Sequence, residues 1–137
     1  MKYQIRNFVV GAGLAALLSS PMLMAQNTET AEIPFDFHVG QSTLPAGTYT
    51  IAKAGMSGIL QLRNDDTSKS IFLGPQGRQS AKNDPKLTFR CYSGDCFLSA
   101  VWMPQSPAYT FVKSSREKEL EQGGARLAMA YVKLATR

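Results

Sequence analysis

The sequence is short of the residue types that most catalytic and metal-binding sites require. It has one histidine, His38, and two cysteines, Cys91 and Cys96, among its 137 residues. A structural zinc site takes four ligands, mainly cysteine and histidine, so this inventory nearly excludes one. The neighbouring Asp65 and Asp66 lack the spaced oxygen ligands and the distal glutamate of a calcium loop. No metal or cofactor is therefore expected.

Long apolar runs are also lacking, apart from a short one near the N-terminus. Lys2 and Arg6 precede an apolar run over residues 8–18, and Ala25 supplies a small residue before Gln26. This arrangement is typical of a cleaved signal peptide over residues 1–25, with cleavage between Ala25 and Gln26. A membrane anchor would need about 20 apolar residues, roughly twice the run present. We therefore expect export to the periplasm or the extracellular space, with no membrane span after signal removal.

The exported part, residues 26–137, has the size of one domain with a single modest core. Removal of Lys2 and Arg6 leaves thirteen basic residues against ten acidic ones, and the formal charge falls from +5 to +3. A nucleic-acid site would gather basic residues with aromatic ones, whereas here the two signs are mixed along the chain. The composition therefore predicts no nucleic-acid partner.

Two alternating segments joined by a turn form the clearest structural pattern in the chain. Residues 33–39 alternate Ile, Phe, Phe and Val with polar residues, which predicts a strand with one apolar face. Pro34 has no amide hydrogen for a ladder and indicates an edge strand. Leu44-Pro45-Ala46-Gly47 suits a type I turn, and Tyr49 and Ile51 resume the alternation beside the first strand. The polar residues 26–32 are expected to be a frayed leader.

The residues of this predicted hairpin also match a sequence pattern of a known protein family. The pattern I-P-F-x-F-x-V-G-x-x-x-L-P-A-G-x-Y is matched from Ile33 through Tyr49, and a weaker match runs through residues 96–102 and 113–120. In these residues, about a third of the exported part, the chain resembles a family of small exported bacterial proteins that is common in soil bacteria. That family has no assigned function. The resemblance implies an exported β-domain and supplies no catalytic or binding residues.

Further strands are expected in the middle of the chain. Residues 58–63 place Leu60 and Leu62 on one face, and residues 70–73 hold three consecutive apolar side chains, which suggests cover on both faces. The residues between them, 64–68, have turn composition. Residues 74–86 show no apolar period and are interpreted as a long surface loop.

Residues 87–92 and 96–102 form a second predicted hairpin. A register with Cys91 opposite Cys96 pairs Phe89 with Leu98 and Leu87 with Ala100, continues the apolar row to Trp102, and leaves Thr88, Arg90 and Ser99 outside. Two cysteines that flank a four-residue turn in an exported chain predict a structural disulfide. The alternative is a redox or metal pair, but redox pairs usually have Cys-x-x-Cys spacing and zinc needs more ligands.

The C-terminal part is predicted to begin with a helix. Ser114 or Ser115 can cap a short helix over about residues 115–122, which Gly123 and Gly124 would end. The tail, residues 125–135, fits either a strand, by its alternation, or a helix, by its alanine content. A closing strand is favoured because the domain otherwise lacks a partner for one edge.

His38, the single histidine of the chain, is the candidate catalytic base. Asp36 precedes it by two residues, a spacing of about 7 Å on a strand, which is too long for an orienting hydrogen bond. Ser42 and Thr43 lie nearby in sequence but lack the glycine-flanked elbow of a nucleophile. We favour a solvated polar strand face over a catalytic site.

Together these patterns predict an all-β fold, a small antiparallel sandwich or partly open barrel of about six or seven strands with one short helix near the C-terminus. The preferred function is a non-catalytic binding or structural module of the cell envelope, with contacts on residues 74–86 and 103–109 and a protein or a glycan as partner. One alternative is a barrel that carries an apolar ligand in a pocket lined by Phe35, Phe37, Tyr49 and Trp102. A hydrolase is the second alternative.

Overall fold

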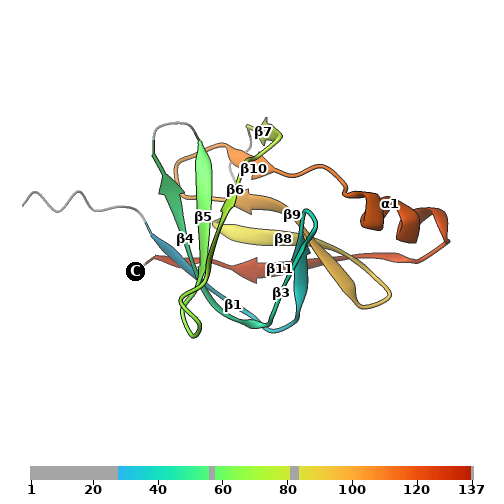
Figure 1. Ribbon diagram of the computed structural model, residues 1–137. Helices are drawn as coiled ribbons and strands as arrows, with labels where there is room; N and C mark the ends of the chain where they lie inside the picture. Colours follow the sequence, from blue (N-terminus) through green and yellow to red (C-terminus); the bar gives the residue numbers. More distant parts are fainter. Residues whose placement is uncertain (1–27, 56–57, 81–83, 137) are drawn as a thin grey trace, which may run out of the picture.

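The computed structural model describes residues 28–55, 58–80 and 84–136. Within these residues the chain forms twelve strands and one helix, arranged as two sheets that pack face to face (Figure 1). The signal peptide expected over residues 1–25, with its cleavage site between Ala25 and Gln26, lies outside the described residues. The one helix in the described part is too short and too polar to span a bilayer.

The first sheet has five antiparallel strands. In spatial order these are β12 (Ala135–Thr136), β1 (Glu29–Ile33), β4 (Gly47–Ala54), β5 (Ile59–Asn64) and β6 (Ser70–Leu73). Alternate residues of β4 and β5 point inward, and Tyr49, Ile51, Leu60 and Leu62 are buried as the sequence predicts. In Figure 1, β4 and β5 run across the direction of the strands in the other sheet.

The second sheet has seven strands and curls into a half-barrel. Its main path is β11 (Leu127–Lys133), β8 (Lys86–Tyr92), β9 (Asp95–Trp102), β10 (Ala108–Thr110) and β7 (Gly77–Gln79), and β2 (Phe37–Val39) with β3 (Ser42–Leu44) joins beside the start of β9. The all-β class is confirmed. The number of described strands exceeds the expected six or seven because many of them are only two to four residues long.

The start of the domain corrects two expectations. Residues 29–32 are no frayed leader, because Glu29 and Ala31 are buried and β1 pairs with β4 along its whole length. The single strand expected over residues 33–39 is two strands, since β1 ends at Ile33 and β2 begins at Phe37. Pro34, which cannot donate to a ladder, lies in the break where the chain passes from the first sheet to the second.

The core between the sheets is built on aromatic side chains. Phe37 meets Tyr49 and Phe89 edge to face, with ring centroids 5.2 and 5.5 Å apart, and Phe35 meets Phe89 at 5.0 Å. This geometry is the preferred one for aromatic pairs. The apolar side chains predicted for residues 33–39 therefore pack between the two sheets, at the point where the chain passes from one sheet to the other.

The β8–β9 hairpin confirms the disulfide and half of the predicted register. Cys91 and Cys96 face each other with Cα atoms 4.0 Å apart and are joined by a disulfide, and Phe89 faces Leu98. A β-bulge between Thr88 and Phe89 then shifts the pairing by one residue. A bulge gives one strand an extra residue and moves the side chains beyond it to the other face.

Because of this shift, the second half of the predicted register is wrong. Leu87 faces Val101 instead of Ala100, and Trp102 leaves the core row for a separate cluster with Ala100 and Ala108. Thr88 and Ser99, expected outside, are buried. The outer face of the second sheet therefore has a small core of its own.

The C-terminal predictions are confirmed. The helix α1 spans Ser115–Gln122, and Ser114 caps it by accepting a hydrogen bond from the amide of Glu117 at 3.2 Å. Gly124, with φ of 80°, is left-handed just after the helix, a conformation that glycine adopts without strain. The tail is the strand β11, antiparallel to β8, and α1 lies at the opposite end of the molecule from the C-terminus (Figure 1).

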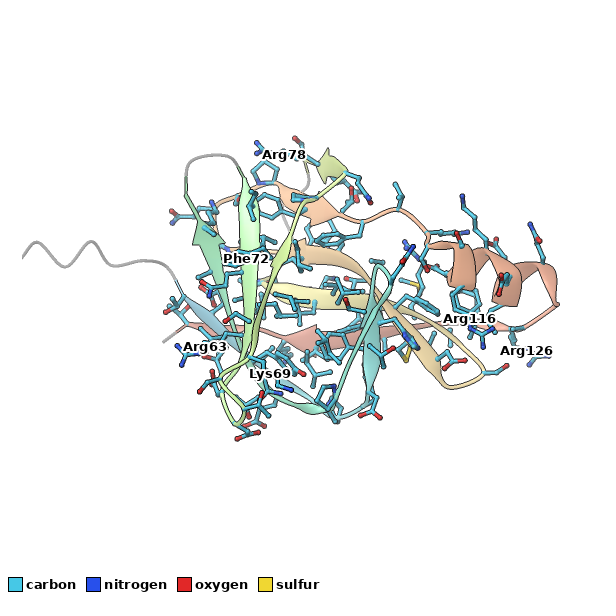
Figure 2. The ribbon with its side chains drawn as sticks, viewed as in Figure 1. Arg63, Lys69, Phe72, Arg78, Arg116 and Arg126 are labelled. Atoms are coloured by element: carbon cyan, nitrogen blue, oxygen red, sulfur yellow. A yellow bond between two sulfur atoms is a disulfide. The ribbon has the colours of Figure 1, made fainter. Side chains whose placement is uncertain are left out.

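Two predictions about exposed segments are wrong in part. Residues 74–86 include the strand β7, which pairs with β10, and Tyr109 on β10 is buried in the core instead of forming a contact surface. Residues 70–73 form the strand β6, but Phe72, labelled in Figure 2, is 65% exposed, so only one face is covered. The end of β6 and the residues that follow it, 74–76, border a cleft.

Candidate functional site

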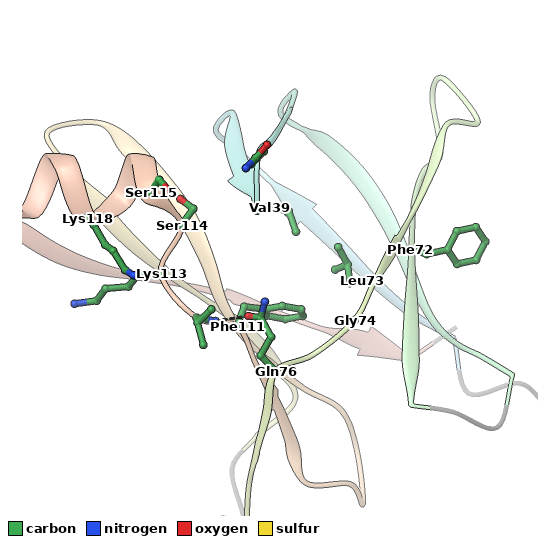
Figure 3. A pocket seen from close by; sticks show the side chains of 13 residues that line it. Val39, Phe72, Leu73, Gly74, Gln76, Phe111, Lys113, Ser114, Ser115 and Lys118 are labelled. Carbon is green, nitrogen blue, oxygen red and sulfur yellow. Dashed lines mark hydrogen bonds between the residues drawn. The ribbon is translucent and has the colours of Figure 1, made fainter.

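A cleft of about 420 Å³ opens where the two sheets part (Figure 3). Its walls come from β6 and the chain after it, from the turn between β2 and β3, and from the segment that leads from β10 into α1. Because β6 is the last strand of the first sheet, its outer edge has no neighbouring strand in the described structure. The cleft therefore lies beside the open edge of the first sheet.

The floor of the cleft is apolar. Val39, Leu73 and Phe111 line it, and all three also contact the core between the sheets. Successive residues of a strand point to opposite faces, so Leu73 turns toward Val39 while Phe72 points away (Figure 3). Phe72 and Val112, each 65% exposed, add apolar surface beside the opening.

The rim of the cleft is polar and is tied together by hydrogen bonds. The Gln76 side-chain oxygen accepts from the amide of Val112 at 2.7 Å, and the Gln76 amide donates to the carbonyl of Thr110 at 3.0 Å. Lys113 forms an ion pair of 2.8 Å with Glu121 of α1. Lys118 completes this wall. The rim thus offers amide, hydroxyl and ammonium groups above an apolar floor.

A buried ion pair fixes α1 and with it one wall of the cleft. Glu117 is 1% exposed and receives hydrogen bonds from Arg90 Nε at 2.5 Å and Arg90 Nη2 at 3.1 Å. The hydroxyl of Tyr92 donates to the same carboxylate at 2.8 Å, and Arg90 Nη2 also reaches the carbonyl of Phe111 at 3.2 Å. Burial, reinforced by the hydrogen bond to Glu117, raises the pKa of Tyr92 to about 12.

Sequence reasoning missed this network. Ser114 and Glu117 are recognisable as the cap and first turn of a helix, but the partners of Glu117 lie 25 and 27 residues away on β8. Arg90 is predicted to lie outside the core. It does lie on the outer face of the second sheet, but there it is partly covered by α1 instead of facing solvent. A carboxylate in the first turn of an otherwise polar helix carries no signal of burial.

His38 lies near the cleft but does not line it. Its Nδ1 is 2.9 Å from Thr43 Oγ1, its Nε2 is 3.6 Å from Asp95 Oδ1, and its ring stacks on Phe97 with centroids 4.7 Å apart. Asp36, as predicted, is not its partner, since that carboxylate accepts from the amide of Ala46. The imidazole is therefore partly buried between strands, and the prediction of a solvated polar face holds for Asp36 but is wrong for His38.

The arrangement of Thr43, His38 and Asp95 has the hydroxyl–imidazole–carboxylate order of a nucleophilic site. The sequence places Thr43 near His38 but gives no hint of Asp95, which begins the strand β9. Acyl transfer also requires donors aimed at a developing oxyanion and a concave site for the substrate. Thr43 is instead exposed, on the short strand β3.

The residues expected to line an apolar ligand pocket are separated. Phe35, Phe37 and Tyr49 belong to the packed core, whereas Trp102 lies on the outer face of the second sheet and donates its indole hydrogen to Thr88 Oγ1 at 3.2 Å. No group of three or more histidine, cysteine, aspartate or glutamate side chains in the described ranges is placed to hold a metal ion.

Comparisons of the chain with models of protein families, with curated proteins and with solved structures found no match.

Proposed function

We propose that the protein is a non-catalytic binding module of the cell envelope, and that the cleft beside β6 is its contact surface. The observation that supports the proposal is the apolar floor of Val39, Leu73 and Phe111 beneath a polar rim. A concave apolar surface with a few converging polar groups is the usual form of a binding site. The envelope location follows from the signal peptide expected over residues 1–25.

The chemistry of the cleft favours binding over turnover. Lys113 and Lys118 are the titratable side chains among the residues that line it, and Lys113 is paired with Glu121. Hydrolysis needs a general acid, a general base or a nucleophile facing the substrate. The groups that could serve, in the Thr43–His38–Asp95 arrangement, do not line the cleft.

The partner is a protein segment or a glycan of the envelope. Gln41, Gln76 and Ser115 present amide and hydroxyl groups that can donate and accept hydrogen bonds, and the floor accepts an apolar side chain or the apolar face of a sugar.

A variant that fills the cleft tests the proposal. A Cβ atom added at Gly74 would meet no heavy atom within 4 Å, so Gly74→Trp places an indole at the cleft without a clash at the backbone. Lys69→Trp, on the exposed turn before β6, is the matched control. When envelope extract is passed over the immobilised protein, wild type and Lys69→Trp should retain the same species and Gly74→Trp should lose them.

Equal retention by all three proteins would contradict the use of the cleft. Turnover in a broad hydrolase screen that His38→Ala abolishes would contradict the non-catalytic function.

A small apolar ligand is a second candidate for the cleft, because its floor is apolar. Such a carrier should bind a fluorescent apolar probe at one site per chain, and Gly74→Trp should displace it. Binding unaffected by Gly74→Trp would place the apolar site elsewhere.

A further inference from the structure

The outer face of the second sheet holds two lysines that face each other. Lys86 on β8 and Lys133 on β11 are directly paired in the ladder, and both alternate with core residues, so they project to the same side. Like charges directly opposite each other destabilise a sheet. Within the described part of the chain, neither lysine forms an ion pair with a carboxylate. The pair is therefore a local concentration of positive charge that the fold does not neutralise.

Two adjoining hollows meet at Lys86, and Lys133 lines one of them. They measure about 340 and 360 Å³, and both are lined by Lys86 and Tyr131. The first extends across the sheet over hydroxyl and amide groups, and the residues that supply them are Gln79, Thr88, Ser99 and Thr110. The second continues past Lys133, with Asp84 as the one carboxylate among its lining residues. Together they form an elongated track in which the lysines and a few polar groups lie among aromatic and aliphatic side chains.

Aromatic rings lie in the same track. Tyr131 is 61% exposed, and the ammonium group of Lys86 lies 4.9 Å from its ring centroid and 5.8 Å from that of Trp102. Cation–π contacts of this kind hold the lysine over the rings while its charge stays available to a ligand.

We infer that this face binds an acidic polysaccharide, with carboxylate groups on Lys86 and Lys133 and a sugar ring against Tyr131. A polyhydroxylated chain matches the hydroxyl and amide groups of the floor, and its negative charge complements the lysine pair. The inference goes beyond the proposed function, because the track shares only Phe111 with the lining of the cleft.

Two other occupants fit the observations less well. A second copy pairing antiparallel along β11 would bring Arg126 of each chain toward Lys133 of the other, which opposes association. An acidic peptide added as a strand to the outer edge of β11 would lie beside the sheet, whereas the first hollow lies across the sheet's outer face.

The test is calorimetric titration of the exported chain, residues 26–137, with alginate, which carries a carboxylate on each sugar, and with neutral dextran of similar length. We expect binding to alginate that weakens with added salt, and none to dextran. Lys86→Gln and Lys133→Gln should each weaken alginate binding about tenfold, as expected for the loss of one charge-assisted hydrogen bond, and Tyr131→Ala should weaken it too.

Three controls give the test its specificity. Lys69→Gln on the β5–β6 turn, Lys118→Gln on the cleft wall and Gly74→Trp should each change the alginate affinity less than twofold, while thermal unfolding verifies that every variant is folded. Loss of envelope capture by Gly74→Trp with alginate binding intact separates the two proposals.

The inference is overturned if alginate does not bind at low salt, or if all lysine variants lose affinity equally. It is also overturned if polyglutamate or vesicles of anionic phospholipid bind more tightly than alginate with the same dependence on Lys86 and Tyr131, or if Tyr131→Ala abolishes a dimer.

Discussion

Glu117 lies on the buried face of α1 and receives hydrogen bonds from Arg90 and Tyr92 of β8. Removal of one partner of a buried ion pair leaves the other charge uncompensated, which typically costs about 3–5 kcal/mol. We expect Glu117→Ala to lower the free energy of unfolding by that amount in urea titrations. Glu119→Ala, an exposed carboxylate of the same helix, should change it by less than about 0.5 kcal/mol. Equal, small losses would show that the pair does not hold the helix.

Tyr92 makes stability depend on pH at the alkaline end. Its pKa is raised from 10.0 to about 12, so folding favours the neutral phenol. The contribution is fully present below pH 10 and is lost as the pH rises from 10 to about 12. Burial also raises the pKa of Tyr49, so wild type has two such contributions.

The variant Tyr92→Phe isolates the effect of Tyr92. The decline in unfolding free energy between pH 10 and 12 should be shallower in Tyr92→Phe than in wild type. An identical slope in the two proteins would mean that Tyr92 titrates as an exposed phenol does.

At the scale of single residues, sequence reasoning found local partners and missed distant ones. The cap by Ser114 depends on the amide three residues away and is readable from the chain. The partners of Glu117, and the Asp95 carboxylate beside His38, come from the strands β8 and β9, and no local pattern encodes their approach.

Among the elements, the β8–β9 hairpin carries the disulfide. Closure of its six-residue loop should contribute about 2 kcal/mol on the chain-entropy estimate. We expect the double variant Cys91→Ala, Cys96→Ala to remain folded and to lose about this much stability. Thiol labelling of the exported protein without reductant should find no free cysteine, and ready labelling of both would contradict a structural bond.

The strand β2 joins the two sheets through Phe37, which is completely buried. Phe37→Ala should cost about 3–5 kcal/mol, because it leaves a cavity among Tyr49 and Phe89. Its neighbours make polar contacts near the surface, so His38→Ala and Asp36→Ala should cost about 1 kcal/mol or less. Thermal unfolding distinguishes these outcomes, and similar large losses in all three variants would contradict the assignment of faces.

Alternation was enough to predict most strands and the faces of β4 and β5, since a period of two is a local property. It did not predict the break at Pro34 or the bulge at Thr88, because both depend on how one strand is paired with another. The three-residue strand β7 has no apolar period and exists only through its pairing with β10.

For the whole molecule, alternation and turn spacing predicted the all-β class, and the need for a partner at one sheet edge favoured the closing strand. They could not predict the order of strands in the sheets, and therefore not the cleft. Its walls come from residues 39–41, 72–76 and 111–118, which no sequence pattern relates to one another. A site of this kind becomes visible only after the fold is known.

Amide chemical-shift mapping of the ¹⁵N-labelled exported chain with an envelope fraction shows whether the cleft is the contact surface, because it locates the contact without requiring the partner to be known. A binding module that uses the cleft predicts shifts gathered at the amides of Gly40, Gly74, Gln76, Val112 and Ser115, with those of the β5–β6 turn unchanged. Shifts gathered at His38, Thr43 and Asp95 instead, or none at any concentration, would contradict it.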